Sequence, residues 1–499
     1  MSSSLVPADF PATPGLDALD AVSVTAGRAP DDVRAVGYTV AASGDVPEEL
    51  GLDREALGRA GFESKPGSTL VLPQASGPVL VAVGVGDGEP DGAALREAVA
   101  AFTRAVSTWA DIAFVVSHAG GLDAEEAGRV LAEGAVLARY RYAVLQSDPK
   151  HTPLERVTLD VSGADGEALA TGIEAGLRAA RATVVARDLA NTPPGHLTAT
   201  DFGAVAQSLG ARFGFGVELF DKAALVELGC GGLLGVNQGS AEEPRMIKLS
   251  YAPDGEASGH LGLVGKGIMY DSGGISLKPS DPMHLLMKMD MGGAAAVLGA
   301  FTSLRDAGAT ARVTGWLMCT DNMPSGSSYK LGDVLRARGG TTIEVKNTDA
   351  EGRLVMCDAF VLANEDEVDA IVDIATLTGA ALMALGQARA PIFANDDALA
   401  DAVLEASEAA DEPLWRMPLE RKYRSQLDSD IADIANLGGK FAGATTAALF
   451  LDHFVGKTPW VHIDIAGTMQ SDSDEVWRSK GATGFGARIL AGTAASFSR

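Results

Sequence analysis

The chain has 499 residues, 46% of them hydrophobic and 21% charged, which is ample apolar material for a large core and excludes a disordered protein. Acidic residues outnumber Lys and Arg by 66 to 40, and the net charge of −26 argues against unaided binding to nucleic acids or anionic membranes, which need clustered basic side chains. Because it has only three cysteines, no secretory signal and no apolar run of about 20 residues, the sequence predicts a cytoplasmic protein with no disulfide framework and no membrane partner.

The first 165 residues predict a small α/β domain, because short apolar runs alternate with Ala-rich helical stretches. Three glycines, Gly84, Gly86 and Gly88, follow one of these runs and resemble the start of a dinucleotide-binding loop. Position 89 is glutamate, where that motif needs its third glycine, so a nucleotide cofactor is disfavoured. The expected strands are 68–72 and 79–83, and the expected helices are 93–107 and 124–138.

A polar, turn-rich stretch at 145–165 marks the end of this domain. A helical segment at 167–187 follows and runs into Asn191-Thr192-Pro193-Pro194-Gly195, where the prolines end the helix. We therefore expect an N-terminal α/β domain at 1–165, a linker helix and turn at 166–195, and a larger domain at 196–499.

The larger domain repeats a pattern of strand, glycine-rich loop and helix. This alternation predicts an α/β fold with a mainly parallel central sheet flanked by helices. In such sheets, ligands bind beyond the carboxyl ends of the strands. The expected strands are 261–264, 311–318, 343–345, 370–374 and 460–465, and the expected helices are 294–304, 353–363 and one that follows Gly379.

Four acidic residues of the larger domain, Asp271, Asp290, Asp349 and Glu351, lie after predicted strands or near a predicted helix start. Asp349 and Glu351 are two residues apart, so in an extended segment their side chains point the same way. Carboxylates brought together repel one another and raise each other's pKa, and divalent cations remove this conflict. The pattern therefore predicts a metal site, in which bridging carboxylates would hold two ions about 3.5–4 Å apart.

Spacing alone leaves simpler interpretations open. Each acid could be a surface carboxylate, and Asp290 could cap the helix that follows it. The run Asp271-Ser272-Gly273-Gly274 is similar to the sequence around the nucleophile of trypsin-like serine proteases, but the α/β pattern and the missing partners disfavour a triad. The seven histidines include no i, i+4 pair, so a His-based zinc protease is not expected.

The block Asn347-Thr348-Asp349-Ala350-Glu351-Gly352-Arg353-Leu354 resembles the signature of the leucyl aminopeptidase family (cytosol aminopeptidase, peptidase family M17). Other blocks resemble the same family in the same order, and together they cover about 188–490. These blocks are 264–279, 290–295, 322–326, 373–380 and 464–468.

The resemblance implies the metal ligands. Lys266, Asp271, Asp290 and Glu351 would hold one ion, and Asp271, Asp349 and Glu351 would hold the other, with the carbonyl oxygen of Asp349 as a further ligand. A lysine ligand must be neutral, and an adjacent dication lowers its pKa from about 10.4. The implied cofactors are two divalent ions per subunit, with Mn²⁺, Zn²⁺ and Mg²⁺ as candidates.

The resemblance also implies a catalytic pair, Lys278 and Arg353. Lys278 would stabilise the oxyanion that forms at the attacked carbonyl. Arg353 would seat a bicarbonate that serves as general base, since its planar guanidinium suits a bidentate anion. For both residues the alternative is an ordinary salt bridge to a nearby acid. The residues expected to line the substrate site are Met287, Asn347, Thr376, Leu377 and Gly379.

The implied activity is that of an aminopeptidase which releases leucine and other apolar residues from the free N-termini of peptides. The water that attacks the peptide bond would be activated by the two metals. The family resemblance further implies a homohexamer. The alternative is a structural or DNA-associated relative without enzymatic activity, which the negative charge and the presence of every expected ligand type disfavour.

Overall fold

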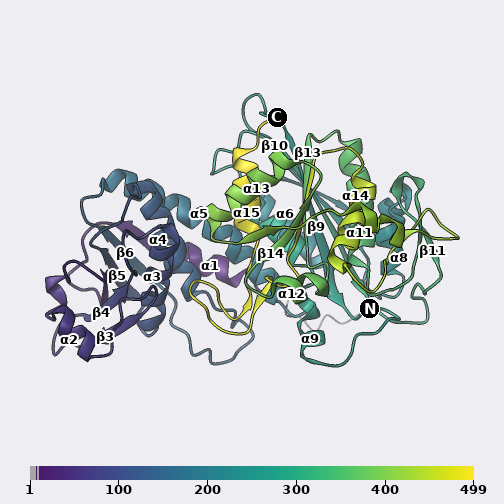
Figure 1. Ribbon diagram of the computed structural model, residues 1–499. Coiled ribbons are helices and arrows are strands. Elements are labelled where there is room, and N and C mark those ends of the chain that lie inside the picture. Colours follow the sequence, from purple (N-terminus) through teal and green to yellow (C-terminus); the bar gives the residue numbers. More distant parts are fainter. Residues whose placement is uncertain (1–6, 8–9) are drawn as a thin grey trace. The chain divides into compact units, whose positions relative to one another are not determined.

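The computed structural model describes residue 7 and residues 10–499, and Figure 1 labels the elements. The chain forms two compact units. The smaller unit consists of Thr13–Val184 and Ser471–Gly481. The larger unit consists of Val185–Gln470 and Ala482–Arg499, with the described residues before Thr13. The expected division into an N-terminal domain at 1–165, a linker at 166–195 and a larger domain at 196–499 stays a prediction.

The smaller unit contains a six-stranded sheet in the order β1-β6-β5-β2-β4-β3, in which only the β3–β4 pair is antiparallel. Helices α3 and α4 pack their apolar faces on it, where Phe102 meets Phe114. Each of these helices begins at an aspartate, Asp91 or Asp123, whose side chain accepts a backbone hydrogen bond. The elements are β1 (Ser23–Ala26), β2 (Ala35–Val40), β3 (Thr69–Leu72), β4 (Val79–Gly84), β5 (Asp111–Val116), β6 (Arg156–Val161), α1 (Pro14–Ala21), α2 (Arg54–Arg59), α3 (Gly92–Ala105) and α4 (Ala124–Arg139).

A short segment from near the C-terminus, Ser471–Gly481, completes the smaller unit. Its Trp477 is 2% exposed and packs in a cluster with Val136 and Tyr140. The guanidinium of Arg104 donates hydrogen bonds of 2.6 Å to backbone carbonyls of this segment. The core of the smaller unit is therefore built from two stretches that are far apart in the sequence.

The larger unit contains an eight-stranded sheet in the order β15-β14-β17-β13-β9-β10-β8-β7. Its four central strands, β17, β13, β9 and β10, are parallel, which confirms the predicted α/β class. Antiparallel pairs occur between β14 and β17 and among β10, β8 and β7. The strands are β7 (Gly216–Phe220), β8 (Arg245–Tyr251), β9 (His260–Asp271), β10 (Arg312–Asn322), β13 (Ala370–Ala375), β14 (Ala390–Ala394), β15 (Leu414–Arg416) and β17 (Trp460–Asp464).

One face of this sheet is covered by α8, α11 and α14, whose apolar residues share a core with the central strands. Leu354 and Phe360 of α11 and Phe450 of α14 lie in this core with Val264 and Ile371. The helices of the larger unit are α6 (Ala199–Phe213), α7 (Lys222–Leu228), α8 (Gly231–Asn237), α9 (Pro282–Leu285), α10 (Gly292–Phe301), α11 (Gly352–Glu365), α12 (Gly379–Leu385), α13 (Asp397–Ala410), α14 (Gly443–Val455) and α15 (Ala487–Ser496), and α5 (Gly166–Asn191) leads into it.

The opposite face of the sheet is covered by α10, and all ten residues of this helix are buried. The helix approaches closely because it begins with small residues. A Cβ atom on Gly265 would lie 2.7 Å from the Cα of Ala294, and one on Gly293 would lie 2.1 Å from the carbonyl oxygen of Ile374. Neighbouring strand residues face opposite sides, so Gly265 faces α10 while Lys266 faces α11.

A three-stranded sheet has β12 between β11 and β16, and its central strand β12 leads into the loop that carries Asn347–Glu351. Within residues 10–499, no helix combines the length and apolarity needed to cross a membrane. The remaining strands are β11 (Val334–Arg336), β12 (Thr342–Glu344), β16 (Ile434–Ala435), β18 (Gln470–Ser471) and β19 (Gly481–Ala482), and the 3-10 helices are Glu48–Leu50, Leu286–Met289, Arg338–Gly340 and Arg421–Leu427.

The close packing of α10 predicts that Gly293→Ala is destabilising. The added methyl group would collide with the backbone of Ile374, and we expect a loss of about 3 kcal/mol in the free energy of unfolding. Gly58→Ala in α2 is the matched control, because a Cβ atom at that position would have nothing within 4 Å, and a gain of about 0.5 kcal/mol is expected. Thermal and urea denaturation measure both effects. Equal stability of the two variants would contradict the prediction.

Candidate active site

The candidate site lies where the central parallel strands end. β9 ends at Asp271, β10 ends at Asn322, and the chain after β13 begins with Thr376. The loop before α11 adds Asp349 and Glu351. The segments that the sequence singled out therefore meet at one edge of the sheet, as expected for a doubly wound fold.

Three carboxylates, those of Asp271, Asp290 and Glu351, form the centre of the site. One oxygen atom of each lies within 4.8 Å of the others, and all three residues are buried. The ammonium of Lys266 lies 2.8 Å from Asp290 Oδ1 and 2.9 Å from Glu351 Oε1. Glycine at position 352 leaves room for this lysine, because a Cβ atom there would lie 2.8 Å from Lys266 Nζ.

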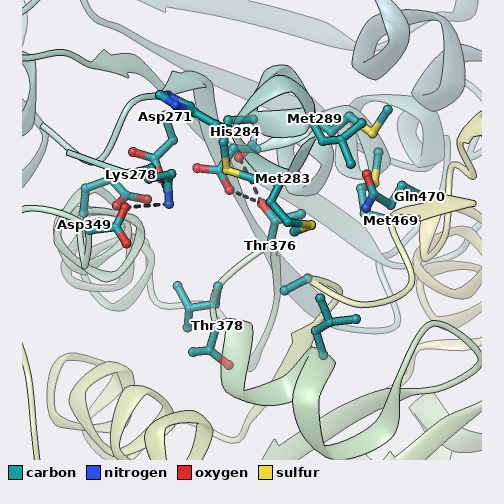
Figure 2. Close-up of a pocket in the computed structure, with 18 of the residues that line it drawn as sticks. Asp271, Lys278, Met283, His284, Met289, Asp349, Thr376, Thr378, Met469 and Gln470 are labelled. Carbon is teal, nitrogen blue, oxygen red and sulfur yellow. Dashed lines mark hydrogen bonds and ion pairs between the residues drawn. The ribbon is translucent and has the colours of Figure 1, made fainter. Parts of the chain in front are cut away.

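Lys278 connects Asp349 to this cluster. Its Nζ atom lies 2.8 Å from Asp271 Oδ2 and 2.5 Å from Asp349 Oδ1, and Figure 2 shows the lysine between the two carboxylates. The side chain of Asp349 is 33% exposed and does not belong to the buried group of three. The four predicted acids therefore converge, with Asp349 on the outer side.

Burial and mutual repulsion shift the pKa values of these acids. Burial, with the charge of Glu351, raises the pKa of Asp271 to about 6. Burial raises the pKa of Asp290 well above its ordinary value, although Lys266 opposes this. Burial alone would raise the pKa of Glu351, but Lys266 and Lys278 outweigh it and hold that pKa below the ordinary value.

The two lysines are held in the charged form by the same interactions. Burial lowers the pKa of Lys266, but Asp290, Glu351 and Asp271 outweigh this and raise it above its ordinary value. Lys278 behaves in the same way, with Asp271 as its strongest partner. Without a bound cation, the two ammonium groups therefore provide the positive charge that offsets the carboxylates.

The donor set fits divalent metal ions. Asp290 Oδ2 and Glu351 Oε2 are buried and have no hydrogen-bond partner among the residues described. A buried carboxylate oxygen without a partner is costly, and a cation bound to it removes that cost. Carboxylate oxygens are ligands of Mg²⁺, Mn²⁺ and Zn²⁺.

Neutral hydrogen bonds orient Asp271. Its Oδ1 atom accepts from Asn322 Nδ2 at 2.8 Å and from the backbone amide of Gly273 at 2.8 Å. The adjacent hydroxyl of Ser272 donates to the carbonyl oxygen of Asn322 at 2.6 Å and accepts from the amide of Gly274. Ser272 is therefore a buried structural residue, which argues against the serine-protease interpretation.

Asp290 does not cap α10, the helix that follows it. The residue at the start of α10 is Met291, and no side chain caps it. Instead, Asp290 Oδ1 accepts hydrogen bonds from Lys266 Nζ and, at 2.7 Å, from Thr376 Oγ1. The carbonyl oxygen of Thr376 also accepts from Lys266 Nζ at 2.8 Å. Thr376 therefore helps to hold both Lys266 and Asp290, which form an ion pair with each other.

Arg353 lies in the first turn of α11 and is only 5% exposed. Its Nε and Nη1 atoms have no hydrogen-bond partner within the described chain, so neither of these two donors is used by Asp349 or Glu351. Burial lowers the pKa of Arg353 to about 10, and the charges of Glu351 and Asp464 oppose this shift. The guanidinium therefore retains free donors that suit an anion.

A cavity of about 330 Å³ opens above the carboxylates. Of the residues expected to line the substrate site, Met287, Thr376, Leu377 and Gly379 do so. Asn347 is absent from the cavity lining, and its side chain instead accepts from the backbone amide of Asp349 at 2.8 Å. Lining residues that the sequence analysis did not name include Met283, His284, Met289, Met469 and Gln470, which Figure 2 labels.

Sequence reasoning also missed a set of buried positioning residues. Asp464 accepts hydrogen bonds from the amide of Leu377 at 3.1 Å and the hydroxyl of Thr378 at 2.7 Å, and so fixes the loop after β13. Asp373 accepts from Trp460 Nε1 and contacts His462 Nδ1, both at 2.6 Å. These residues lie in or beside the segments 373–380 and 464–468, which resemble the aminopeptidase family in sequence. That resemblance was the one feature of the sequence that could have pointed to them.

Comparison with known proteins identifies the family. The model of the cytosol aminopeptidase family, catalytic domain, matches residues 184–491, and that of its N-terminal domain matches residues 46–149. The chain belongs to the cytosol aminopeptidase family. A "Probable cytosol aminopeptidase" of Streptomyces avermitilis is 44% identical over 455 residues, 87% of each chain. A second from Clavibacter michiganensis subsp. michiganensis is 40% identical over 508 residues, 96% of this chain and 99% of the relative.

A solved structure supports this membership. The "Bottromycin maturation enzyme BotP in complex with Mn" has a TM-score of 0.84 and 39% identity, and the match covers 93% of this chain and 99% of that one. All the carboxylates and lysines of the candidate site fall in the region matched by the family's catalytic domain. The site and the family assignment therefore rest on the same part of the chain.

The contact between Thr376 and Asp290 gives a testable prediction. Thr376→Val removes the 2.7 Å hydrogen bond while keeping the shape, so Asp290 loses one of the groups that orient it. If Asp290 holds a metal ion, we expect peptide hydrolysis to fall by about 10-fold with little change in melting temperature. Thr310→Val at an exposed position is the control. Full activity of Thr376→Val would contradict this role.

Proposed function

We propose that the protein is a metal-dependent aminopeptidase that removes the N-terminal residue of peptides, with a preference for leucine and other apolar residues. The observation that carries this proposal is the group of three buried carboxylates, Asp271, Asp290 and Glu351, beside two lysines at a 330 Å³ cavity. A structural protein without activity would have no need of such a costly arrangement. The names of the relatives support the same activity.

The proposed cofactors are two divalent ions per subunit. Mn²⁺, Zn²⁺ and Mg²⁺ are the candidates, and the complex of BotP with Mn supports the first of them. Bound ions would lower the pKa of a water molecule to about 7 and polarise the scissile carbonyl. The neighbouring dication would also hold the lysine ligand in its neutral form. The proposed ligands are Lys266, Asp271, Asp290, Asp349 and Glu351.

Lys278 and Arg353 supply the remaining charges of the proposed mechanism. The ammonium of Lys278 stands between Asp271 and Asp349 at the edge of the cluster, where it can donate to the oxyanion of the attacked carbonyl. The free Nε–H and Nη1–H groups of Arg353 suit a bicarbonate, which would carry the proton from the attacking water to the leaving amine.

Substrate selection follows from the charge and the lining of the cavity. A cluster of carboxylates and bound metals favours a free α-amine, which an acetylated peptide lacks. The apolar side chain of the first residue would contact Met287, Met289, Leu382 and Met469, because these residues line the same cavity. Methionine is polarisable and adapts to side chains of different shapes. This lining favours leucine and methionine over charged residues.

Two further parts of the proposal rest on the family. The relatives are named cytosol aminopeptidases, which supports a cytoplasmic location. We also propose a homohexamer, as the family resemblance implies. With a net charge of −26, no nucleic-acid partner is proposed.

The proposal predicts loss of activity when metal is removed. Dialysis against a chelator should abolish cleavage of leucine p-nitroanilide, since the attacking water is then no longer activated. Added Mn²⁺ should restore cleavage, and elemental analysis of the active protein should give two divalent ions per chain. The N-acetylated substrate is the control and should not be cleaved. Activity that survives in the chelator, or cleavage of the acetylated substrate, would contradict the mechanism.

Substitutions of Lys278 and Ser272 separate this mechanism from serine catalysis. Lys278→Met should lower kcat by about 100-fold or more, since it removes a donor to the oxyanion, and should change KM little. Ser272→Ala should retain activity within about 10-fold, because its hydroxyl serves only to hold the loop. The measurement is steady-state kinetics on a leucine substrate. A Ser272→Ala variant without activity and a fully active Lys278→Met variant would reverse the assignment.

A further inference from the structure

The smaller unit contains a cavity of about 370 Å³ that has no place in the proposed peptidase mechanism. It lies between α1, the end of α4 and the loop that follows α4. Its volume is in the range of small-molecule binding sites. The walls are mainly apolar and include Leu19, Val22, Val136, Leu154 and Val184.

The charged side chains that line this cavity are all basic. They are Arg139, Arg141 and His151, and none of the described lining residues is acidic. Burial, together with the positive charges of Arg139 and Arg141, lowers the pKa of His151. The field of the two arginines therefore reaches the cavity, although the protein as a whole carries a charge of −26.

Arg139 is 7% exposed and holds its charge without a carboxylate partner in the described structure. Its guanidinium donates to backbone carbonyls at the end of α3 and nearby, including Thr103 at 2.9 Å, Trp109 at 3.0 Å and Thr152 at 2.9 Å. Its Nε atom lacks any hydrogen-bond partner among the described residues. Because arginine stays charged in proteins, a donor is left without an acceptor beside an apolar cavity.

We propose that this cavity binds a small apolar carboxylate, whose negative charge is met by Arg139 and Arg141 and whose hydrocarbon part packs on the apolar wall. The neutral imidazole of His151 donates a hydrogen bond to the carboxylate. A single negative charge supplies the counter-ion that the two arginines lack. The lining offers no acidic group for an ammonium, so a carboxylate without an amine fits better than a free amino acid. This inference does not depend on the peptidase activity.

Isothermal titration of the full-length protein with 4-methylpentanoate tests the proposal. This probe combines a carboxylate with a branched apolar tail. Charge-assisted hydrogen bonds and burial of the tail should together give a dissociation constant below about 1 mM. The uncharged analogue 4-methylpentan-1-ol should bind at least about 10-fold more weakly, because it cannot neutralise the arginines.

Arg141→Gln and His151→Gln should each weaken binding of 4-methylpentanoate by about 10-fold or more. Neither residue belongs to the proposed active site, so hydrolysis of leucine p-nitroanilide should not change. Arg59→Gln, an exposed arginine of the same unit, is the matched control and should bind like the unmodified protein. The proposal is overturned if no binding is detected, if the alcohol binds equally well, or if Arg141→Gln binds as tightly as Arg59→Gln. The last outcome would place the carboxylate elsewhere, for example on metal ions bound at the proposed active site.

Discussion

The repulsion between buried carboxylates is the constraint on which the larger unit depends. Asp271, Asp290 and Glu351 bring three buried acidic groups close together. Such an arrangement is unfavourable unless opposite charges lie among the acids, and Lys266 and Lys278 occupy these places. The oxygens that the lysines leave unpaired are the ones that metal ions would use.

The fold provides this arrangement with small residues and neutral donors rather than with further charges. Gly293 lets α10 approach the sheet, and Gly352 leaves room beside α11 for the side chain of Lys266. Asn322 and Thr376 then orient individual carboxylates, and Asp464 holds the loop that carries Thr376. Each donor comes from the end of a strand or the loop after it. The geometry of the site is therefore a direct product of parallel strands that end at one edge.

The sequence predicted those helices and strands in which apolar residues recur at regular spacing. The expected strand 79–83 is β4, the expected helix 353–363 is α11, and the convergence of the four acids agrees with their predicted positions after strands or near a helix start. The antiparallel strands β7, β8 and β14 were not predicted, because a short apolar run does not specify its partner or direction. The orientation of Arg353 and Asn347 depends on how α11 and its loop pack on the sheet, and spacing does not encode that packing.

The return of the chain to the smaller unit at Ser471–Gly481 has a consequence for modularity. Because Trp477 belongs to a core formed mainly by residues before Val184, neither unit corresponds to one uninterrupted stretch of the gene. A fragment cut only near residue 184 would separate this tryptophan from its packing partners. Recombination between relatives would therefore need two matched crossover points to exchange either unit intact.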